Sequence, residues 1–309
     1  MFLNKKLLEQ NTLDFTDDDK QNTFLAMQKF ILEKQSNNET FYIGRLSGNE
    51  TKFTGSILNN NYNLDYLMHD MLHEAGIKFN NKNDMSEYAK LYNTSVLNCD
   101  LLGVWNCGMH DQAKSYYNYL LQHNIDLKSQ LICVQSLEPY YFMKSKYYMF
   151  YEVFKNKKIL IVTSHYHTTM KQLENRDNMF CNKIFHETSS FHIYKPPQQN
   201  GGNSNNDSWN VHFQKIKADL KKIKEETFDF DIALVSCGGF GMITCDYIKE
   251  ELKSSVIYVG GALQLYFGII GSRWVQHDII STLINNYWMK PLDSDKPSNP
   301  NLCEGNCYW

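Results

Sequence analysis

Short apolar runs rich in β-branched residues alternate in this chain with longer stretches of helical periodicity, and this alternation constrains the fold more than any other feature. Strands separated by helices pair in parallel, because the chain must cross back over the sheet before each new strand begins. The pattern predicts an α/β protein with a Rossmann-like, mostly parallel sheet and helices on both faces. The runs are 41–44 (FYIG), 100–105 (DLLGVW), 130–135 (QLICVQ), 157–164 (KKILIVTS), 231–236 (DIALVS) and 255–260 (SVIYVG).

Helical periodicity fills the intervals between these runs. Thr16 is placed as the N-cap of the first helix, whose apolar residues recur at helical spacing as far as Ile31. A mostly helical region then reaches about residue 97, with Asn-rich breaks near 59–63 and 80–84. Further helices are expected over 110–122, 168–179, 209–226, 242–252 and 262–267.

The end of the sequence is irregular. Pro291, Pro297 and Pro300 end regular structure, and the Asn- and Gly-rich stretch 194–208 is too short to link two domains. We therefore expect one domain over residues 1–288 and an irregular tail over 289–309 that packs back on it.

Composition excludes several classes of protein. With 309 residues, 42% of them hydrophobic and 21% charged, the chain can bury a large core. The net charge of −3 provides no basic surplus for nucleic-acid binding. None of the eight cysteines forms a CxxC pair, which fits reduced, buried thiols and a cytoplasmic protein. There is no secretory h-region and no apolar run long enough to span a membrane.

The clearest motif is CGGFG (237–241), which follows the run DIALVS and opens a helix. Gly238, Gly239 and Gly241 let backbone N–H groups face outward at a helix end, where phosphate binds well. The full GxGxxG is missing, and Gly260 stands where an NAD site needs an acid, so dinucleotide binding is disfavoured. Tight strand-to-helix packing without a ligand is the alternative.

A second small-residue turn lies in IGRLSGNE (43–50). Arg45 can fork onto a diphosphate or a carboxylate, and Ser47 and Gly48 form the turn. Glu50 can bind a metal, accept a sugar hydroxyl or act as a base. The alternative is an Arg–Glu pair that only braces the turn.

The helix expected after KKILIVTS also begins with polar residues. Ser164 and Thr168 offer hydroxyls or caps, and Gln172 and Arg176 share one helix face. Glu138, in SLEPYY (136–141), follows another strand. Ligands bind at the carboxyl ends of strands in such sheets, so we expect these motifs to converge on a single site.

Two further groups look like metal sites but are not expected to be. His165 and His167 lack a third ligand in register. Asp293 and Asp295 spell DSD, but they lie in the Pro-rich tail, where a solvated turn is expected.

The motifs IGRLSGNE, SLEPYYF, KKILIVTSHYHTTMKQLENRDNMF, FDFDIALVSCGGFGMITCDYIK, VIYVGGALQLYFGIIGSRW and CEGNCYW together resemble a family of uncharacterised proteins from bacterial surface-polysaccharide clusters and large DNA viruses. These proteins look like distant relatives of the GT-D-type glycosyltransferases. The resemblance covers about residues 40–309. It implies transfer of a sugar from a nucleoside-diphosphate sugar to a glycan acceptor in surface polysaccharide synthesis. The sequence leaves open whether the chain forms a homo-oligomer.

The resemblance also assigns residues. The GT-D turn carries a metal-binding acid-x-acid; Glu50 matches its second acid, Gly48 replaces its first, and dependence on Mn²⁺ or Mg²⁺ is therefore open. Arg45 matches an arginine of that turn. The remaining matches to the narrower family are Thr168, Gln172, Arg176, Gly238, Gly239, Gly241, Gly260, Gly261 and Arg273.

As a mechanism, arginines and helix-end amides would stabilise the leaving diphosphate, and Glu50 or Glu138 would deprotonate the acceptor. Two other readings stay open. One is a non-catalytic protein that binds sugar nucleotides or glycans in a polysaccharide assembly complex. The other is a different Rossmann-type transferase, such as a pyruvyl or phosphosugar transferase.

Overall fold

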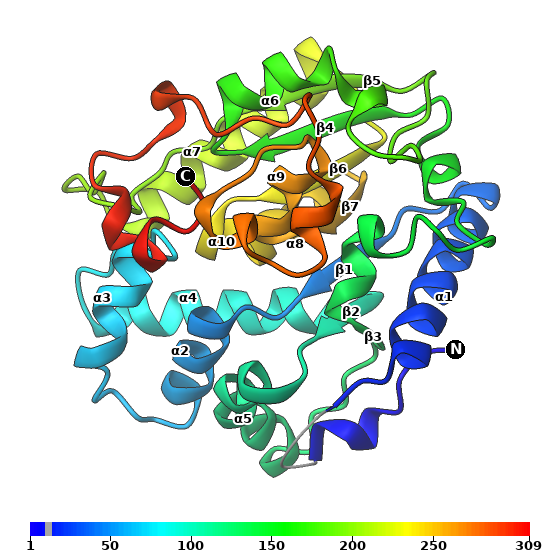
Figure 1. Ribbon diagram of the computed structural model, residues 1–309. Helices are drawn as coiled ribbons and strands as arrows, with labels where there is room; N and C mark the ends of the chain where they lie inside the picture. Colours follow the sequence, from blue (N-terminus) through cyan, green and yellow to red (C-terminus); the bar gives the residue numbers. More distant parts are fainter. Residues whose placement is uncertain (10–13) are drawn as a thin grey trace.

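A seven-stranded, all-parallel sheet forms the centre of the protein in the computed structural model (Figure 1). The structure describes residues 1–9 and 14–309, without the side chains of 107–112. The strand order is β3-β2-β1-β7-β6-β4-β5, which confirms the predicted α/β, Rossmann-like class. The strands are β1 (Tyr42–Arg45), β2 (Leu101–Val104), β3 (Gln130–Cys133), β4 (Lys158–Thr163), β5 (Ser190–Tyr194), β6 (Ile232–Ser236) and β7 (Ser255–Tyr258).

The order in which the chain adds strands to the sheet reverses between β1 and β7. The chain moves outward from β1 through β2 to β3, then starts again on the other side with β4 and returns inward through β6 to β7, which pairs with β1. In sheets of this kind the crevice at such a switch point, outside the carboxyl ends of the strands, receives the ligand. The topology therefore singles out the ends of β1 and β7.

Helices cover both faces because strand side chains alternate. In β4, Leu160 and Val162 join one apolar cluster, whereas Ile159 and Ile161 join the other. The first face is covered by α2 (Gly48–Leu58), α3 (Asp65–His73), α4 (Lys82–Leu97), α5 (Cys107–Gln122), α7 (Trp209–Lys222) and α8 (Gly241–Glu250). The second is covered by α1 (Asp17–Ser36), α6 (Tyr166–Leu173), α9 (Leu263–Tyr266) and α10 (Ser272–Val275).

The start of α1 agrees with the sequence. Thr16 is its N-cap, and a capping box links Thr16 and Asp19 in both directions, at 3.1 and 3.0 Å. Among the described residues, no helix is both long and apolar enough to cross a membrane.

One strand was not predicted. The segment of β5 reads SFHIY, with an exposed Ser190 and only partly buried residues up to Ile193. It lies at the edge of the sheet and, among the described strands, pairs with β4 alone. An edge strand needs no continuous apolar run, so the pattern used to find the other strands misses it.

The tail over 289–309 is irregular, as expected, but the solvated turn predicted at the DSD segment is wrong for one of its acids. Asp293 is exposed and pairs with Lys296 at 2.8 Å. Asp295 is only 2% exposed. Its carboxylate accepts the backbone N–H of His167 at 3.1 Å and both the N–H and the hydroxyl of Thr168 at 2.7 Å. Asp295 therefore caps α6 from the tail.

Candidate functional site

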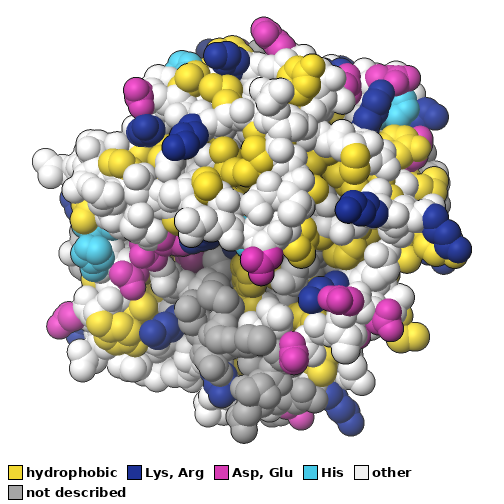
Figure 2. Space-filling view, viewed as in Figure 1, with side chains coloured by type: hydrophobic (Ala, Val, Ile, Leu, Met, Phe, Trp, Pro, Cys, Tyr) yellow, Lys and Arg dark blue, Asp and Glu magenta, His cyan; other side chains and the backbone are white. Residues whose placement is uncertain are grey.

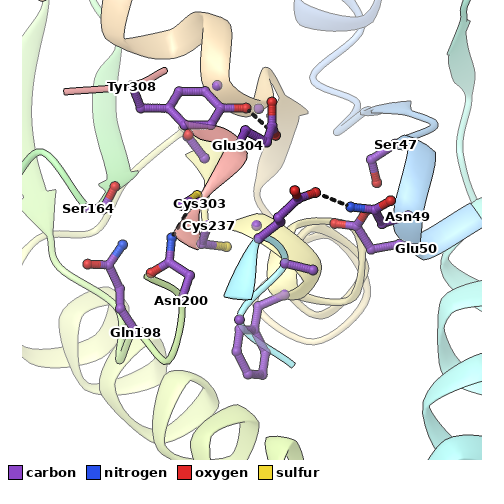
Figure 3. Close-up of a pocket in the computed structure, with 18 of the residues that line it drawn as sticks. Ser47, Asn49, Glu50, Ser164, Gln198, Asn200, Cys237, Cys303, Glu304 and Tyr308 are labelled. Atoms are coloured by element: carbon purple, nitrogen blue, oxygen red, sulfur yellow. Dashed lines mark hydrogen bonds between the residues drawn. The ribbon is translucent and has the colours of Figure 1, made fainter. Parts of the chain in front are cut away.

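A cavity of about 500 Å³ lies at the carboxyl ends of the strands, at the switch point (Figure 3). The turns after β1, β4, β6 and β7 all contribute to its wall, together with the loop around Asn200 and the tail. Figure 3 shows Ser47 and Glu50 on one side, Ser164 and Gln198 on the other, and tail residues such as Tyr308 above. The tail thus forms part of the wall of this cavity.

The structure brings together most of the residues proposed from the strand-end turns. These are Arg45, Ser47, Gly48, Glu50, Ser164, Gly238, Gly260, Gly261 and Arg273. It places the other proposed residues outside the cavity wall. These are Glu138, Thr168, Gln172, Arg176, Gly239 and Gly241.

Each excluded polar residue is engaged elsewhere. Thr168 bonds to Asp295, and Glu138 accepts a 2.6 Å hydrogen bond from the Tyr140 hydroxyl. Gln172 donates to two backbone carbonyls at 2.9 Å, and Arg176 stacks on the Phe191 ring, with 5.2 Å from Cζ to the centroid. These contacts hold the fold together around the site.

The glycine turn after β6 divides in the same way. Gly238 lines the cavity with φ +54°. The N–H of Gly239 donates to the Ala75 carbonyl at 2.8 Å, so this amide is already used. A Cβ on Gly241 would lie 2.1 Å from the Tyr258 ring. Gly239 and Gly241 thus serve tight strand-to-helix packing, which was the alternative to ligand binding for this turn.

Arg45 is the most distinctive group in the cavity. Its Nη1 donates to the Val259 carbonyl at 3.1 Å, and its guanidinium lies 5.0 Å from the Trp105 ring and 5.7 Å from the Tyr258 ring. Its buried Nε has no partner, and no described carboxylate pairs with it. The Arg–Glu ion pair considered from the sequence is therefore absent among the described residues, and a fork of donors stays available for an anion.

Gly260 allows this position of Arg45. The glycine has φ +67°, and a Cβ built on it would lie 2.8 Å from the Arg45 Cζ. A side chain at 260 would both strain the backbone and displace the guanidinium.

Glu50 lies in the first turn of α2, three residues after the N-cap Ser47. The residue is 5% exposed, and burial of its carboxylate raises the pKa above the usual range. Its own backbone N–H, the Ser47 side chain and the charge of Arg45 oppose this rise. Glu50 is thus a desolvated carboxylate close to the arginine.

Replacing Glu50 with glutamine is expected to raise the melting temperature at pH 7.5. A carboxyl whose pKa is raised on folding binds more protons in the folded state than in the unfolded state. Ionised Glu50 therefore destabilises the folded protein once the pH rises above the ordinary pKa of a glutamate. The gain should shrink as the pH falls toward 4, where the acid is protonated in both states. Calorimetric melts of both proteins from pH 4 to 8 measure it; equal melting temperatures at every pH would contradict it.

Sequence reasoning missed two acids in the wall. Glu74, just after α3, accepts a 2.5 Å hydrogen bond from Asn49 Nδ2. Glu304 accepts one from the Tyr308 hydroxyl at 3.0 Å and pairs with Arg273. Glu304 and Tyr308 belong to the motif CEGNCYW and were within reach of the sequence. No local pattern marks Glu74, because tertiary packing alone brings α3 to the site.

The fit of a metal can be tested on the donors present. Within the described part of the chain, no group of three or more His, Cys, Asp or Glu side chains is arranged to hold a metal ion. The turn that would carry two acids holds Gly48 and Glu50. The steps proposed below use only the chain's own residues.

Comparisons of this chain with models of protein families, with curated proteins and with solved structures gave no match.

Proposed function

We propose that the protein is a glycosyltransferase that moves a sugar from a nucleoside-diphosphate sugar to a glycan acceptor, in the synthesis of a surface polysaccharide. One observation carries the proposal: Arg45, which pairs with no carboxylate among the described residues, lies in a cavity at the switch point of a parallel sheet. A cavity of about 500 Å³ falls within the range of small-molecule and cofactor sites.

Sugar transfer requires positive charge beside the leaving diphosphate. As the bond between the anomeric carbon and the phosphate oxygen breaks, charge develops on the diphosphate. The Arg45 guanidinium and the start of α2, where the side chain of the N-cap Ser47 accepts no hydrogen bond from the helix backbone, would stabilise that charge. Arg273 is held by Glu304 and Tyr308 and would contribute less.

The polar and aromatic wall suits the rest of the donor. Ser164, Gln198 and Asn200 lie opposite the α2 end (Figure 3) and offer groups for sugar hydroxyls or a base. The proposal carries with it a cytoplasmic location and possible use of Mn²⁺ or Mg²⁺ supplied with the donor.

Calorimetric titration with UDP-, GDP- and dTDP-sugars, each with and without Mn²⁺, tests this function. We expect one nucleotide class to bind, with release of nucleoside diphosphate on incubation. Arg176→Gln is a matched control: it removes an arginine outside the cavity and should bind like the wild type. No binding by any donor at millimolar concentration would contradict the proposal. Binding without turnover would favour a non-catalytic sugar-nucleotide-binding protein.

A further inference from the structure

We propose that Glu74 is the general base of this transfer and that Asn49 positions it. This inference rests on the proposed function and names the group that receives the acceptor's proton. It differs from the assignment suggested by the sequence, which gave that role to Glu50 or Glu138.

The position of Glu74 suits a base. The residue follows the last turn of α3 and lines the cavity near the start of α2. Asn49 Nδ2 donates to its Oε2 at 2.5 Å, the bond drawn from Asn49 in Figure 3. Among the described residues, none donates a hydrogen bond to Oε1 of Glu74. One oxygen is therefore fixed and the other is left for a substrate hydroxyl.

The other carboxylates near the cavity are less suited. Glu50 is only 5% exposed, at the start of α2. Glu50 is therefore less accessible to an acceptor hydroxyl than the partly buried Glu74. Glu304 is paired with Arg273 and accepts from Tyr308. A carboxylate paired with a cation, as Glu304 is, binds a proton less readily. Glu74 has neither a cation partner among the described residues nor a second donor.

Acidic side chains around α3 make Glu74 bind a proton more readily. They gather over α3 on the face shown in Figure 2. Burial raises the pKa of Glu74, and so do Asp70 and Glu50, while the bond from Asn49 and the charge of His69 lower it. Two thiols of the tail, Cys303 and Cys307, also interact with Glu74, and Arg45, Arg273 and Glu304 line the same cavity.

The step balances as a single displacement. The acceptor hydroxyl loses its proton to Oε1 of Glu74, and its oxygen forms a bond to the anomeric carbon. The bond from that carbon to the donor's phosphate oxygen breaks, and its electron pair leaves with the nucleoside diphosphate, facing Arg45. Glu74 ends protonated and returns the proton to solvent. Attack on the face opposite the leaving group inverts the anomeric configuration.

Water as the acceptor allows a test without knowledge of the glycan. Release of nucleoside diphosphate is measured from UDP-glucose, GDP-mannose and dTDP-glucose with wild-type, Glu74→Gln and Glu74→Asp proteins. We expect Glu74→Gln to reduce the rate about 100-fold or more, the usual contribution of a positioned base. Donor affinity by calorimetry should change less than about twofold, because the glutamine oxygen still accepts from Asn49. Glu74→Asp should retain intermediate activity.

The pH profile supplies an independent readout. The rate should fall at low pH as Glu74 becomes protonated. Asp70→Asn removes a carboxylate that raises the Glu74 pKa and does not line the cavity. It should shift this acidic limb to lower pH and leave the maximal rate unchanged. A structural role for Glu74 would not produce that shift.

The outcomes separate the two proposals. A Glu74→Gln protein that binds and turns over donor like the wild type overturns the role of Glu74 only, as does a product that retains the anomeric configuration by nuclear magnetic resonance. A wild-type protein that binds none of the donors overturns the proposed function as well.

Discussion

Replacing Arg45 with glutamine is expected to weaken nucleotide-sugar binding about 100-fold, since loss of one partner of a buried charge pair costs about 2–5 kcal/mol. The guanidinium is flanked by the Trp105 and Tyr258 rings and has no carboxylate partner in the described part of the chain. Removing the guanidinium therefore takes away a positive charge that forms no direct ion pair with a described residue. Calorimetric titration with the donor that the wild type binds measures the effect.

Two variants make the test specific. Arg45→Lys keeps the charge but loses the planar fork, so we expect a loss of about tenfold. Arg273→Gln removes an arginine already paired with Glu304, and its effect should be smaller than that of Arg45→Gln. If Arg45→Gln binds as tightly as the wild type, the cavity does not bind a diphosphate through this residue.

Replacing Asp295 with alanine is expected to lower the free energy of unfolding by about 3–5 kcal/mol, the usual cost of removing one side of a buried charged interaction. The loss leaves two backbone N–H groups and the Thr168 hydroxyl of α6 without their acceptor. Urea or thermal unfolding measures it.

Asp293→Ala is the matched control. This aspartate lies two residues earlier, is exposed and pairs with Lys296 on the surface, so its loss should change stability by less than about 0.5 kcal/mol. Asp295→Asn keeps one acceptor oxygen and should fall between the two. If Asp295→Ala and Asp293→Ala are equally stable, the tail does not cap α6.

Local pattern was enough for much of the fold. Six strands, the α/β class and the Thr16 cap all follow from residues adjacent in sequence, because strand and helix periodicity is imposed by nearest neighbours. The edge strand β5 escaped, because one-sided burial leaves no continuous apolar run. The same reasoning placed Arg45 and Gly260 at strand ends, and these ends do meet at one cavity.

The sequence by itself therefore determined which turns follow strands, and in a parallel sheet that is sufficient to put Arg45 and Gly260 on the same edge. Only the tertiary structure decided that Thr168 donates a hydrogen bond to Asp295, that Gly239 is used in packing, and that Glu74 lines the cavity. The physical reason is the range of the contacts. Asp295 lies 127 residues from Thr168 in the chain, and such pairings depend on how completed elements pack rather than on any repeat in the residues themselves.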